Sequence, residues 1–599
     1  MTAMADLLPA QMARVEAINL VGDWLFSQLG ALPIDQTFAE RWPSKNLTHG
    51  WRLPPLADHT ATVLELYIDN RFPRSAPRVF WVNAPPFPSI PHVEADGFIC
   101  ALTAIDVIDP SYPVGLAQAV FRNVANIIED GKTGANIEDF RLEFTSYWNP
   151  LASGKPVTSL VDPSGPSREI AVWYGKHVTV VGENVGDLRS WLSHRADEKS
   201  ASKLEIERGT LVWLNQPLLP DEYPSSVADL RELAGRPDVG AEAAVERELG
   251  RTQDRLTFVL GAATTEGASF GAVSMLALPT RRGRSRLPGF RPGRAPPGLL
   301  AASRSLLPIV RNPIDRADAR WVHGRDQNND LIDLLTAKVV FIGCGSLGSP
   351  IARLLAQAGV GFLRLIDPQA VQWPNTARHA LGARSIHTNK ALSLAKALQQ
   401  DFPSSRISGT DKSWQDVALA DAASIFECDL IVSTLGSWTD EAELNDRLID
   451  RAMSTTTLFA WSEPRAVGGH AVLIGGHGGC LACGLDRYGT PRFKIADFLG
   501  PTLSKEPACG EHFQAYGASQ IDVIAALTAD VALEYLTGRL ERGRHRMCAA
   551  REAVANIAGG TFSAAWTELS GGRTTGGNIE EREWPIDPKC AACREMART

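Results

Sequence analysis

Nine cysteines are spread over the 599 residues, and four of them form two close pairs. Cys480 and Cys483 are one C-x-x-C pair, and Cys590 and Cys593 are the second. Four thiolates at this spacing suit one tetrahedral Zn²⁺ once the chain folds. Because a Cys₄ site leaves no coordination position open, we expect a structural zinc. A redox or disulfide pair, or free thiols in the core, are the alternatives.

A glycine-rich stretch, VVFIGCGSLGSPIARLL, follows an apolar run and opens a helical pattern. Its glycines, Gly343, Gly345 and Gly348, allow a tight turn and a close approach of the backbone to a phosphate. A second apolar run ends at Asp367, which suits the ribose of an adenosine. This motif alone fits a redox dinucleotide as well as ATP.

The residues after Asp367 favour ATP. Asn375, Arg378 and Lys390 follow within a short stretch. Cationic and amide side chains beyond the adenosine suit a triphosphate, because attack on its α-phosphate develops charge that needs fixed donors. A nicotinamide has no comparable need. The simpler alternative is that these are solvated surface charges.

Two further cysteines are candidate nucleophiles. Cys509 follows a Pro-containing loop and precedes a long helical pattern, and a helix N-terminus stabilises a thiolate. Cys100 ends the segment IPHVEADGFIC, in which His92 is either catalytic or structural. A structural role is the alternative for both cysteines. The others, which we expect in the core or as a spacer, are Cys344, Cys428 and Cys548.

Three domains are expected to position these residues, because 599 residues are too many for one core. Residues 1–150 form one α/β pattern, and residues 151–311 form a second without a catalytic constellation. Residues 312–599 alternate strands and helices as a mostly parallel, doubly wound sheet does. The basic, Gly/Pro-rich stretch 281–298 is interpreted as a solvated linker, with a docking loop for an acidic partner as the alternative.

Composition excludes several classes of function. A net charge of -8 argues against nucleic acid or an anionic membrane as the main partner. No apolar run reaches the roughly 20 residues of a membrane helix. The N-terminus lacks the basic start and apolar core of a secretory signal. Sparse cysteines, odd in number, fit a reducing cytoplasm better than a disulfide scaffold.

The C-terminal pattern resembles the ubiquitin-activating superfamily, which includes the sulfur-carrier adenylating enzymes ThiF and MoeB. That family combines GxGxxG, an aspartate, Asn-x-x-Arg-Gln and Lys-Ala; here His379 replaces the glutamine. The resemblance implies ATP and magnesium at the residues named above. It also implies a homodimer in which Arg325, or alternatively Arg320, completes the ATP site of the partner subunit.

One departure from this family concerns magnesium. The family's metal-holding aspartate falls at Gly436, although the following Asn445 is kept. Asp440 is the candidate that compensates from the next turn. The resemblance also assigns Cys509 as the thiol that takes the acyl group from AMP, and many ThiF-like enzymes carry two C-x-x-C pairs in this order.

The N-terminal segment resembles a ubiquitin-conjugating domain. Gly97, Ile99 and Cys100 match that family's Gly-x-Ile-Cys, and a Pro-rich segment precedes them. The family's His-Pro-Asn is not matched, because Val93 and Glu94 follow the histidine. The asparagine that supports the oxyanion during lysine attack is therefore missing.

The order of domains resembles the bacterial conjugating–activating fusions of type II CBASS anti-phage operons. The expected fold is multidomain α/β: an N-terminal ubiquitin-conjugating-like α+β fold, a middle α/β linker domain, and a doubly wound ThiF/MoeB-like domain with the Cys₄ zinc. The resemblance implies that a partner's C-terminal carboxylate is adenylated, passed to Cys509 and Cys100, and joined to a target amine.

The implied acyl donor is the CBASS cyclic-nucleotide synthase, the CD-NTase. A dedicated ubiquitin-like protein as donor is the first alternative. An NAD(P)-dependent Rossmann oxidoreductase with a zinc module is the second, and a scaffold with degenerate active sites is the third.

Overall fold

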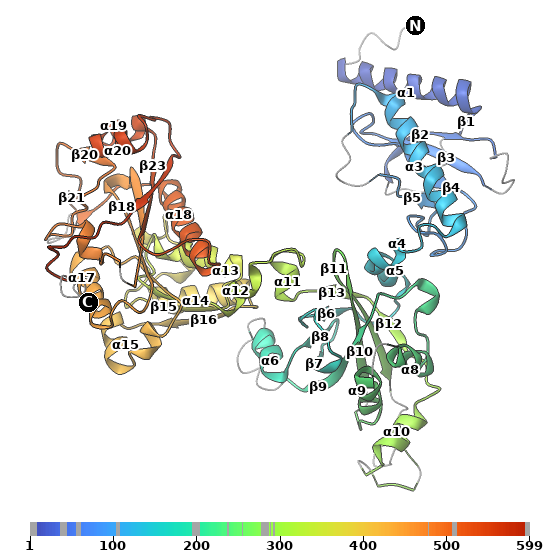
Figure 1. Cartoon of the computed structure of the whole chain (residues 1–599). Helices are drawn as coiled ribbons and strands as arrows, with labels where there is room; N and C mark the ends of the chain where they lie inside the picture. Colours follow the sequence, from blue (N-terminus) through green and yellow to red (C-terminus); the bar gives the residue numbers. More distant parts are fainter. Residues whose placement is uncertain are drawn as a thin grey trace. The chain divides into compact units, whose positions relative to one another are not determined.

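The fold was obtained as a computed structural model of the chain (Figure 1). It describes all residues except 1–8, 36–44, 56–61, 103–107, 194–203, 237–238, 254, 277–286, 288, 292–293, 477, 506–511 and 594–599. Contacts divide the chain into two units, Met1–Val181 with Glu207–Asp315 and Gly182–Ile206 with Arg316–Thr599. No helix in the described ranges has both the length and the apolar character that crossing a membrane requires.

The N-terminal sheet has five strands in the order β1-β2-β3-β4-β5, all paired antiparallel. The long helix α3 buries Ala117, Val120, Val124 and Ile128, a spacing of three or four residues that gives one apolar face. That face packs with α1 and the strands around one core. The elements are α1 Pro9–Leu29, β1 Leu32–Pro33, β2 Leu47–Arg52, β3 Leu64–Asp69, β4 Arg78–Trp81, β5 Phe98–Ile99 and α3 Pro113–Thr133.

Two short helices follow, α4 (Asp139–Leu142) and α5 (Phe144–Leu151). Phe144 and Trp148 of α5 belong to the core of the middle sheet, and the Trp148 indole Nε1 donates to the carbonyl of Asn312 at 2.9 Å. The hydrophobic core of the middle sheet therefore already includes residues of α5, just before residue 150. The predicted boundaries at residues 150 and 311 stay predictions.

The middle sheet has eight strands in the order β12-β11-β10-β9-β7-β8-β6-β13. Its strands are β6 Val157–Ser159, β7 Arg168–Tyr174, β8 Thr179–Gly182, β9 Ile206–Leu214, β10 Arg255–Thr264, β11 Gly267–Leu276, β12 Val310–Asn312 and β13 Ile314–Arg316. Its helices include α8 Val227–Gly235, α9 Val239–Leu249 and α10 Pro297–Ser303.

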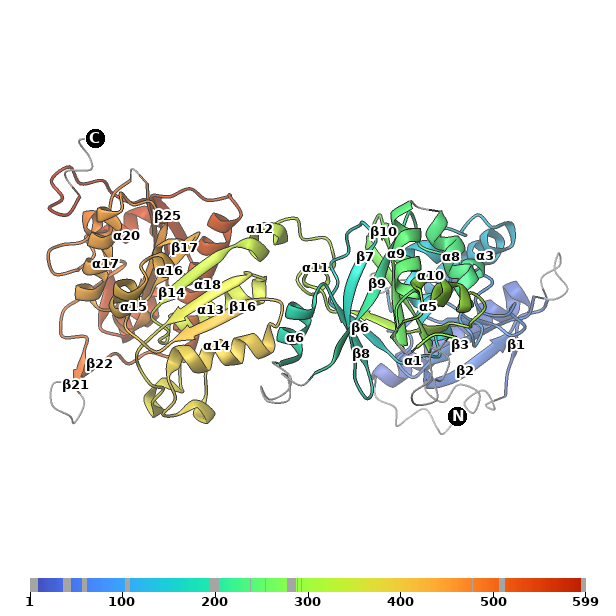
Figure 2. The ribbon, with the colours of Figure 1, turned by 90° about the horizontal axis from the view of Figure 1, so that it is seen from below.

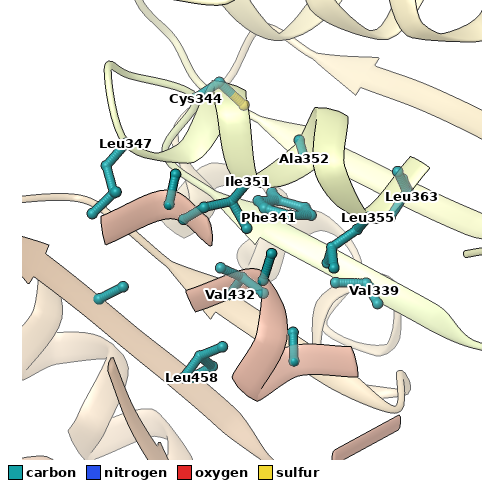
Figure 3. Packing of buried hydrophobic residues seen from close by; sticks show 14 of the residues in the cluster. Val339, Phe341, Cys344, Leu347, Ile351, Ala352, Leu355, Leu363, Val432 and Leu458 are labelled. Atoms are coloured by element: carbon teal, nitrogen blue, oxygen red, sulfur yellow. The ribbon is translucent and has the colours of Figure 1, made fainter. Parts of the chain in front are cut away.

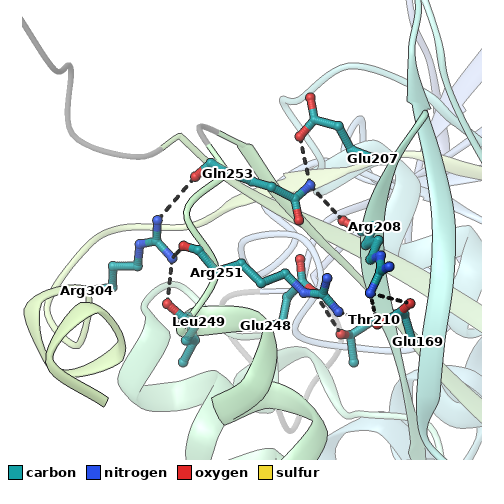
Figure 4. Close-up of polar contacts among 9 residues, drawn as sticks. All are labelled: Glu169, Glu207, Arg208, Thr210, Glu248, Leu249, Arg251, Gln253 and Arg304. Atoms are coloured by element: carbon teal, nitrogen blue, oxygen red, sulfur yellow. Dashed lines mark hydrogen bonds and ion pairs between the residues drawn. The ribbon is translucent and has the colours of Figure 1, made fainter. Parts of the chain in front are cut away.

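A buried arginine closes the end of α9 (Figure 4). The Arg304 guanidinium donates to the carbonyls of Leu249, Arg251 and Gln253 at 2.5, 2.8 and 3.2 Å. The last carbonyls of a helix have no partner within it, so this side chain supplies one. The arginine therefore has a structural role.

The C-terminal sheet also has eight strands, in the order β16-β15-β14-β17-β18-β19-β23-β25. The five strands from β16 to β18 run parallel, and the remaining three pair antiparallel. The strands are β14 Lys338–Ile342, β15 Phe362–Ile366, β16 Arg406–Thr410, β17 Leu430–Ser433, β18 Thr457–Ser462, β19 Gly468–Ile474, β23 Arg544–Ala549 and β25 Ile579–Glu583.

Helices cover both faces of this sheet, as Figure 2 shows. Val339 and Phe341 of β14 lie in one apolar cluster with Ile351 and Leu355 of α13 (Figure 3), to which α14 and α18 also contribute. Val340 and Ile342 pack with α15, α16 and α17 in a second cluster. Successive residues of a strand point to opposite faces, so both faces must be apolar. The expected multidomain α/β fold with a doubly wound sheet is confirmed. The helices are α13 Gly348–Ala358, α14 Lys390–Asp401, α15 Trp414–Ala420, α16 Ala423–Phe426, α17 Trp438–Asp450 and α18 Ala518–Leu536.

Candidate functional site

The glycine-rich loop joins the end of β14 to the start of α13. Gly343 has a left-handed φ of 96°, and a Cβ on Gly348 would lie 2.2 Å from the carbonyl oxygen of Gly343. Both positions therefore need glycine. The backbone N–H groups of Gly345, Ser346 and Leu347 donate to no acceptor within the described part of the chain. Such amides at a helix N-terminus are an anion site.

Asp367 follows β15 and fastens this loop. Its carboxylate accepts the backbone N–H of Cys344 and of Gln369, each at 2.8 Å, and the residue is only 6% exposed. Each carboxylate oxygen keeps a second lone pair for a ligand hydroxyl. The predicted ribose contact agrees with this arrangement and stays a prediction.

His379 supports the loop from the position where the family has glutamine. The N–H of Leu381 donates to Nδ1 at 2.9 Å, so the proton of the neutral ring is on Nε2. Nε2 in turn donates to the carbonyl of Cys344 at 2.7 Å. Burial lowers the pKa of His379, which keeps the ring neutral. The imidazole therefore fixes the loop backbone.

Three predicted phosphate-site residues lie in the segment after Asp367. Lys390 is the first residue of α14, and its buried Nζ donates to Gln369 Oε1 at 2.7 Å. Asn375 Oδ1 accepts the N–H of Gln372 at 2.9 Å, which leaves its amide nitrogen available.

Arg378 packs on the ring of Tyr516 at 4.5 Å and donates to the carbonyl of Gln514 at 3.4 Å. Its Nε is buried and has no hydrogen-bond partner among the described residues. A buried donor without an acceptor is costly, so this group is suited to an anionic ligand.

The two C-x-x-C pairs come together. The Sγ atoms of Cys480 and Cys590 are 3.7 Å apart, those of Cys483 and Cys593 are 3.5 Å apart, and all four lie within 4.8 Å of one another. A tetrahedral zinc with bonds of ~2.3 Å needs sulfurs about 3.8 Å apart, so the site fits the metal. The hydrogen bond between the two thiols lowers the pKa of Cys483 and raises that of Cys480.

Cys100 follows β5 as an exposed, free thiol. Its backbone N–H donates to the carbonyl of His92 at 2.8 Å. Partial burial and the negative charges of Glu143 and Glu94 raise the pKa of the thiol. The surroundings of this cysteine are therefore acidic.

His92 lies between two acidic side chains, one of which is Glu143. It has a left-handed φ of 62°, and its N–H donates to the Tyr147 hydroxyl at 2.9 Å. Its Nε2 lies 3.0 Å from Asp139 Oδ2, and its Nδ1 lies 3.6 Å from Glu143 Oε2. Both ring nitrogens face carboxylates. The His92 ring therefore links the loop before Cys100 to the segment of α4 and α5 that carries Asp139 and Glu143. The sequence alone did not indicate a role for Asp139 and Glu143, which lie in the stretch EDFRLE, residues 138–143.

Comparisons with known proteins match both ends of the chain. The ThiF family matches residues 324–567, and the prokaryotic E2 family B matches residues 25–157. The N-terminal domain is therefore E2-like, and the C-terminal domain is a ThiF-like adenylation domain. It is an adenylating and conjugating enzyme, as the sequence predicts.

Relatives extend over most of the chain. An ATP-dependent ubiquitin transferase-like protein Cap2 of Pseudomonas aeruginosa is 23% identical over 506 residues, which are 82% of this chain and 88% of the relative. A protein of the same name from Escherichia coli is 22% identical and covers 84% and 86%. The E. coli MccB structure is 18% identical over 44% of this chain and 67% of MccB, with a TM-score of 0.32.

Gly436 follows β17 at the position where the family resemblance predicts a magnesium-holding aspartate. Gly436 has a φ of 66°, and no atom lies within 4 Å of where its Cβ would be. Asp440, the predicted substitute, accepts a hydrogen bond from Gln415 Nε2 at 3.0 Å. Asn445 accepts the N–H of Leu481 at 2.8 Å and so supports the first C-x-x-C pair.

Glu441 is a carboxyl in this region that the sequence did not single out. Burial raises its pKa to about 7, against a hydrogen bond from Gly436 that lowers it. Its Oε1 is buried without a partner in the described ranges. Its spacing of four residues from Asn445 is the signal that could have drawn attention to it.

The predicted trans-acting arginine lies in the segment before α12 (Leu331–Thr336). Arg325 is exposed and lies over the Trp321 ring at 5.0 Å. The segment is fixed by Arg316, which pairs with Asp318 at 2.8 Å and with Asp326. Arg320, the alternative, is half-buried.

Cys509 lies outside the described residues, within 506–511. The strands on either side, β21 (Ser504–Lys505) and β22 (His512–Phe513), pair antiparallel. The following helix α18 begins only at Ala518, so Cys509 is not in its first turn. Its role as nucleophile stays a prediction.

Proposed function

We propose that the chain activates the C-terminal carboxylate of a partner protein as an acyl-adenylate and passes the acyl group through Cys509 and Cys100 to an amine. The observation that carries this proposal is the loop site. Within the described residues, the backbone amides of Gly345, Ser346 and Leu347 donate to no acceptor, and the same domain holds a buried Arg378 Nε without a partner. These donors suit the phosphates of ATP.

The first step forms a bond between a carboxylate oxygen of the donor and the α-phosphorus of ATP. The bond from that phosphorus to the bridging oxygen breaks, and pyrophosphate leaves. The loop amides, Arg378 and Lys390 hold the phosphates, and Asp367 holds the ribose. Magnesium would neutralise the leaving pyrophosphate, with Asp440 or Glu441 as the nearby carboxylates. The four-cysteine site would hold zinc in a structural role.

Two thiols then carry the acyl group. The Cys509 thiolate attacks the acyl carbon and AMP leaves, after which the Cys100 thiolate displaces Cys509. Finally the amine of a target loses a proton and attacks, so that a C–N bond forms and the C–S bond breaks. Unpaired thiols persist in a reducing cytoplasm, which is where we place the reaction.

The proposed donor is a CBASS cyclic-nucleotide synthase of the CD-NTase class, on the resemblance of the domain order. A dedicated ubiquitin-like protein remains the second candidate, because the same chemistry serves either carboxylate. ATP–pyrophosphate exchange with each protein decides between them. We expect exchange only with the synthase; exchange only with the ubiquitin-like protein would replace the donor. NAD(P) binding without any exchange would overturn the proposed chemistry.

The proposed assembly is a homodimer through residues 312–599, in which the exposed Arg325 of each chain completes the ATP site of the other. Light scattering should give a dimer, and Arg325→Ala should lower exchange. A monomer that keeps full exchange would contradict this assembly.

A further inference from the structure

Two consecutive residues between β18 and β19 adopt a left-handed backbone, although neither of them is glycine. Arg465 has a φ of 57° and Ala466 a φ of 52°. Residues other than glycine avoid this region because Cβ crowds the backbone. Such strain persists where the surroundings enforce it, and it concentrates at functional sites.

The surroundings do enforce this conformation. The Ala466 N–H donates to the carbonyl of Glu463 at 2.9 Å, and the buried Glu463 carboxylate accepts from the backbone N–H groups of Ile495 and Ala496 at 2.5 and 2.9 Å. The Arg465 N–H donates to Gln514 Oε1 at 2.9 Å. The turn is therefore anchored on both sides of Arg465.

This turn lies at the ligand edge of the sheet. β18 runs parallel to β17, and β17 runs parallel to β14, so their C-terminal ends share the edge that carries the glycine-rich loop. Ligands of open α/β sheets bind outside the carboxyl ends of the strands. One glutamine connects the turn to the phosphate site, because Gln514 accepts from Arg465 through its side chain and from Arg378 through its carbonyl.

The guanidinium of Arg465 is not used by the fold. The residue is half-buried, and its side chain makes no hydrogen bond or ion pair within the described ranges. The predicted nucleotide residues Asp367, Asn375 and Lys390 all follow β15, on one side of β14. Arg465 follows β18, on the other side of β14.

We propose that Arg465 binds the C-terminal carboxylate of the acyl donor and holds it for attack on the α-phosphate. The donor carboxylate and the triphosphate are both negatively charged and repel each other. The carboxylate therefore needs a cationic partner that does not bind the phosphates. A guanidinium matches both oxygens of a carboxylate in a fixed geometry. The strained turn aims this side chain. The inference rests on the proposed function and names the donor-binding residue of the same site.

The chemistry of the step is unchanged. One carboxylate oxygen forms the bond to phosphorus, pyrophosphate leaves with the electron pair of the broken P–O bond, and no proton moves to or from Arg465. The arginine releases the donor as its carboxylate charge is lost in the acyl-adenylate.

The test measures binding of a synthetic peptide with the C-terminal sequence of the synthase, in the presence of an ATP analogue that resists α–β cleavage. The peptide is made with a free carboxylate and, for comparison, with a C-terminal amide. We expect the wild-type protein to prefer the carboxylate by about 10- to 100-fold, the range of a charge-assisted hydrogen bond. Arg465→Gly should abolish that preference, and Arg465→Lys should keep part of it.

Arg465→Gly is informative because glycine accepts the left-handed backbone, so thermal stability should not fall. Ala466→Gly is the matched control: it relaxes the neighbouring strain, keeps the guanidinium and should keep the preference. If the preference for the free-carboxylate peptide survives in Arg465→Gly, or is lost equally in Ala466→Gly, the role of Arg465 is wrong while the proposed function stands. Absence of ATP–pyrophosphate exchange by the wild type with the synthase would overturn the proposed donor and this inference together.

Discussion

The loop site and the Cys100 site have opposite electrostatic surroundings. The loop site gathers backbone amides that have no acceptor in the described part of the chain with Arg378 and the buried Lys390, whereas Cys100 faces Glu94 and Glu143. A cationic site suits a polyanion such as ATP, and an acidic one suits the ammonium of a lysine. A raised thiol pKa also makes Cys100 a poorer leaving group, so the proposed thioester on it would persist until an amine arrives. Each site therefore suits a different stage of the proposed reaction.

The largest effect is expected at the loop. Gly348→Val places atoms against the carbonyl of Gly343 and should lower the free energy of unfolding by about 3 kcal/mol. Pyrophosphate exchange should fall by at least about 100-fold. Gly345→Ala is the control, because no atom lies within 4 Å of its Cβ position. It should unfold at the wild-type temperature; an equal loss of stability in both variants would contradict the packing described here.

Removal of zinc is expected to disable one site and spare the other. Cys480→Ser breaks the four-sulfur site, so the purified variant should lack stoichiometric zinc and lose at least about 3 kcal/mol of stability in the ThiF domain. Zinc content is measured by atomic emission and stability by denaturant unfolding. Alkylation of Cys100 under native conditions should be unchanged. A variant as stable as the wild type would show that the cysteines bind no structural metal.

A smaller effect is expected from Arg378→Ala. Loss of its guanidinium should reduce pyrophosphate exchange about 100-fold, because the phosphates lose a fixed donor. Stability should fall by no more than about 1 kcal/mol, because the variant loses only a long hydrogen bond to the Gln514 carbonyl and the packing on Tyr516. Arg378→Lys keeps the positive charge but lacks the paired N–H donors of the guanidinium, so its exchange rate should lie between those of the wild type and Arg378→Ala. Wild-type exchange in Arg378→Ala would remove this residue from the phosphate site.

The smallest effect is expected at Cys100. Glu143→Gln removes a negative charge that raises the thiol pKa, so the pKa falls and more thiolate forms at any pH below it. The rate of iodoacetamide alkylation there should rise by a factor between about two and ten, and its pH midpoint should move down. Glu138→Gln, which removes an exposed acid paired with Arg141, is the control. A rate that rises equally in both variants would show that Glu143 has no specific influence.

Sequence reasoning identified the features that depend on local spacing. The glycine loop, Asp367 and the two C-x-x-C pairs are read directly from the order of residues, because each motif requires fixed offsets. The alternation of strand and helix patterns along residues 312–599 likewise predicted the doubly wound sheet. Cys509 was also chosen from its place in the sequence, but it lies outside the described residues, so its role stays a prediction.

Features that depend on tertiary contacts were not predicted. Asp139 and Glu143 reach His92 only through the fold of α4 and α5. Glu441 is an ordinary acid of an amphipathic helix until its burial is known. The left-handed turn at Arg465 has no sequence signal, because neither of its strained residues is a glycine. These are positions where the folded environment overrides local preference.

The central claim is that ATP bound at the loop drives an acyl group onto Cys509 and then onto Cys100. Mass-spectrometric mapping of the cysteine peptides, after incubation with ATP and the synthase, tests it most directly. We expect the donor's C-terminal remnant on Cys100 in the wild type, on Cys509 alone in Cys100→Ala, and on neither cysteine in Cys509→Ala. A remnant on Cys100 in Cys509→Ala, or a thiol-sensitive adduct in the double variant, would contradict the account.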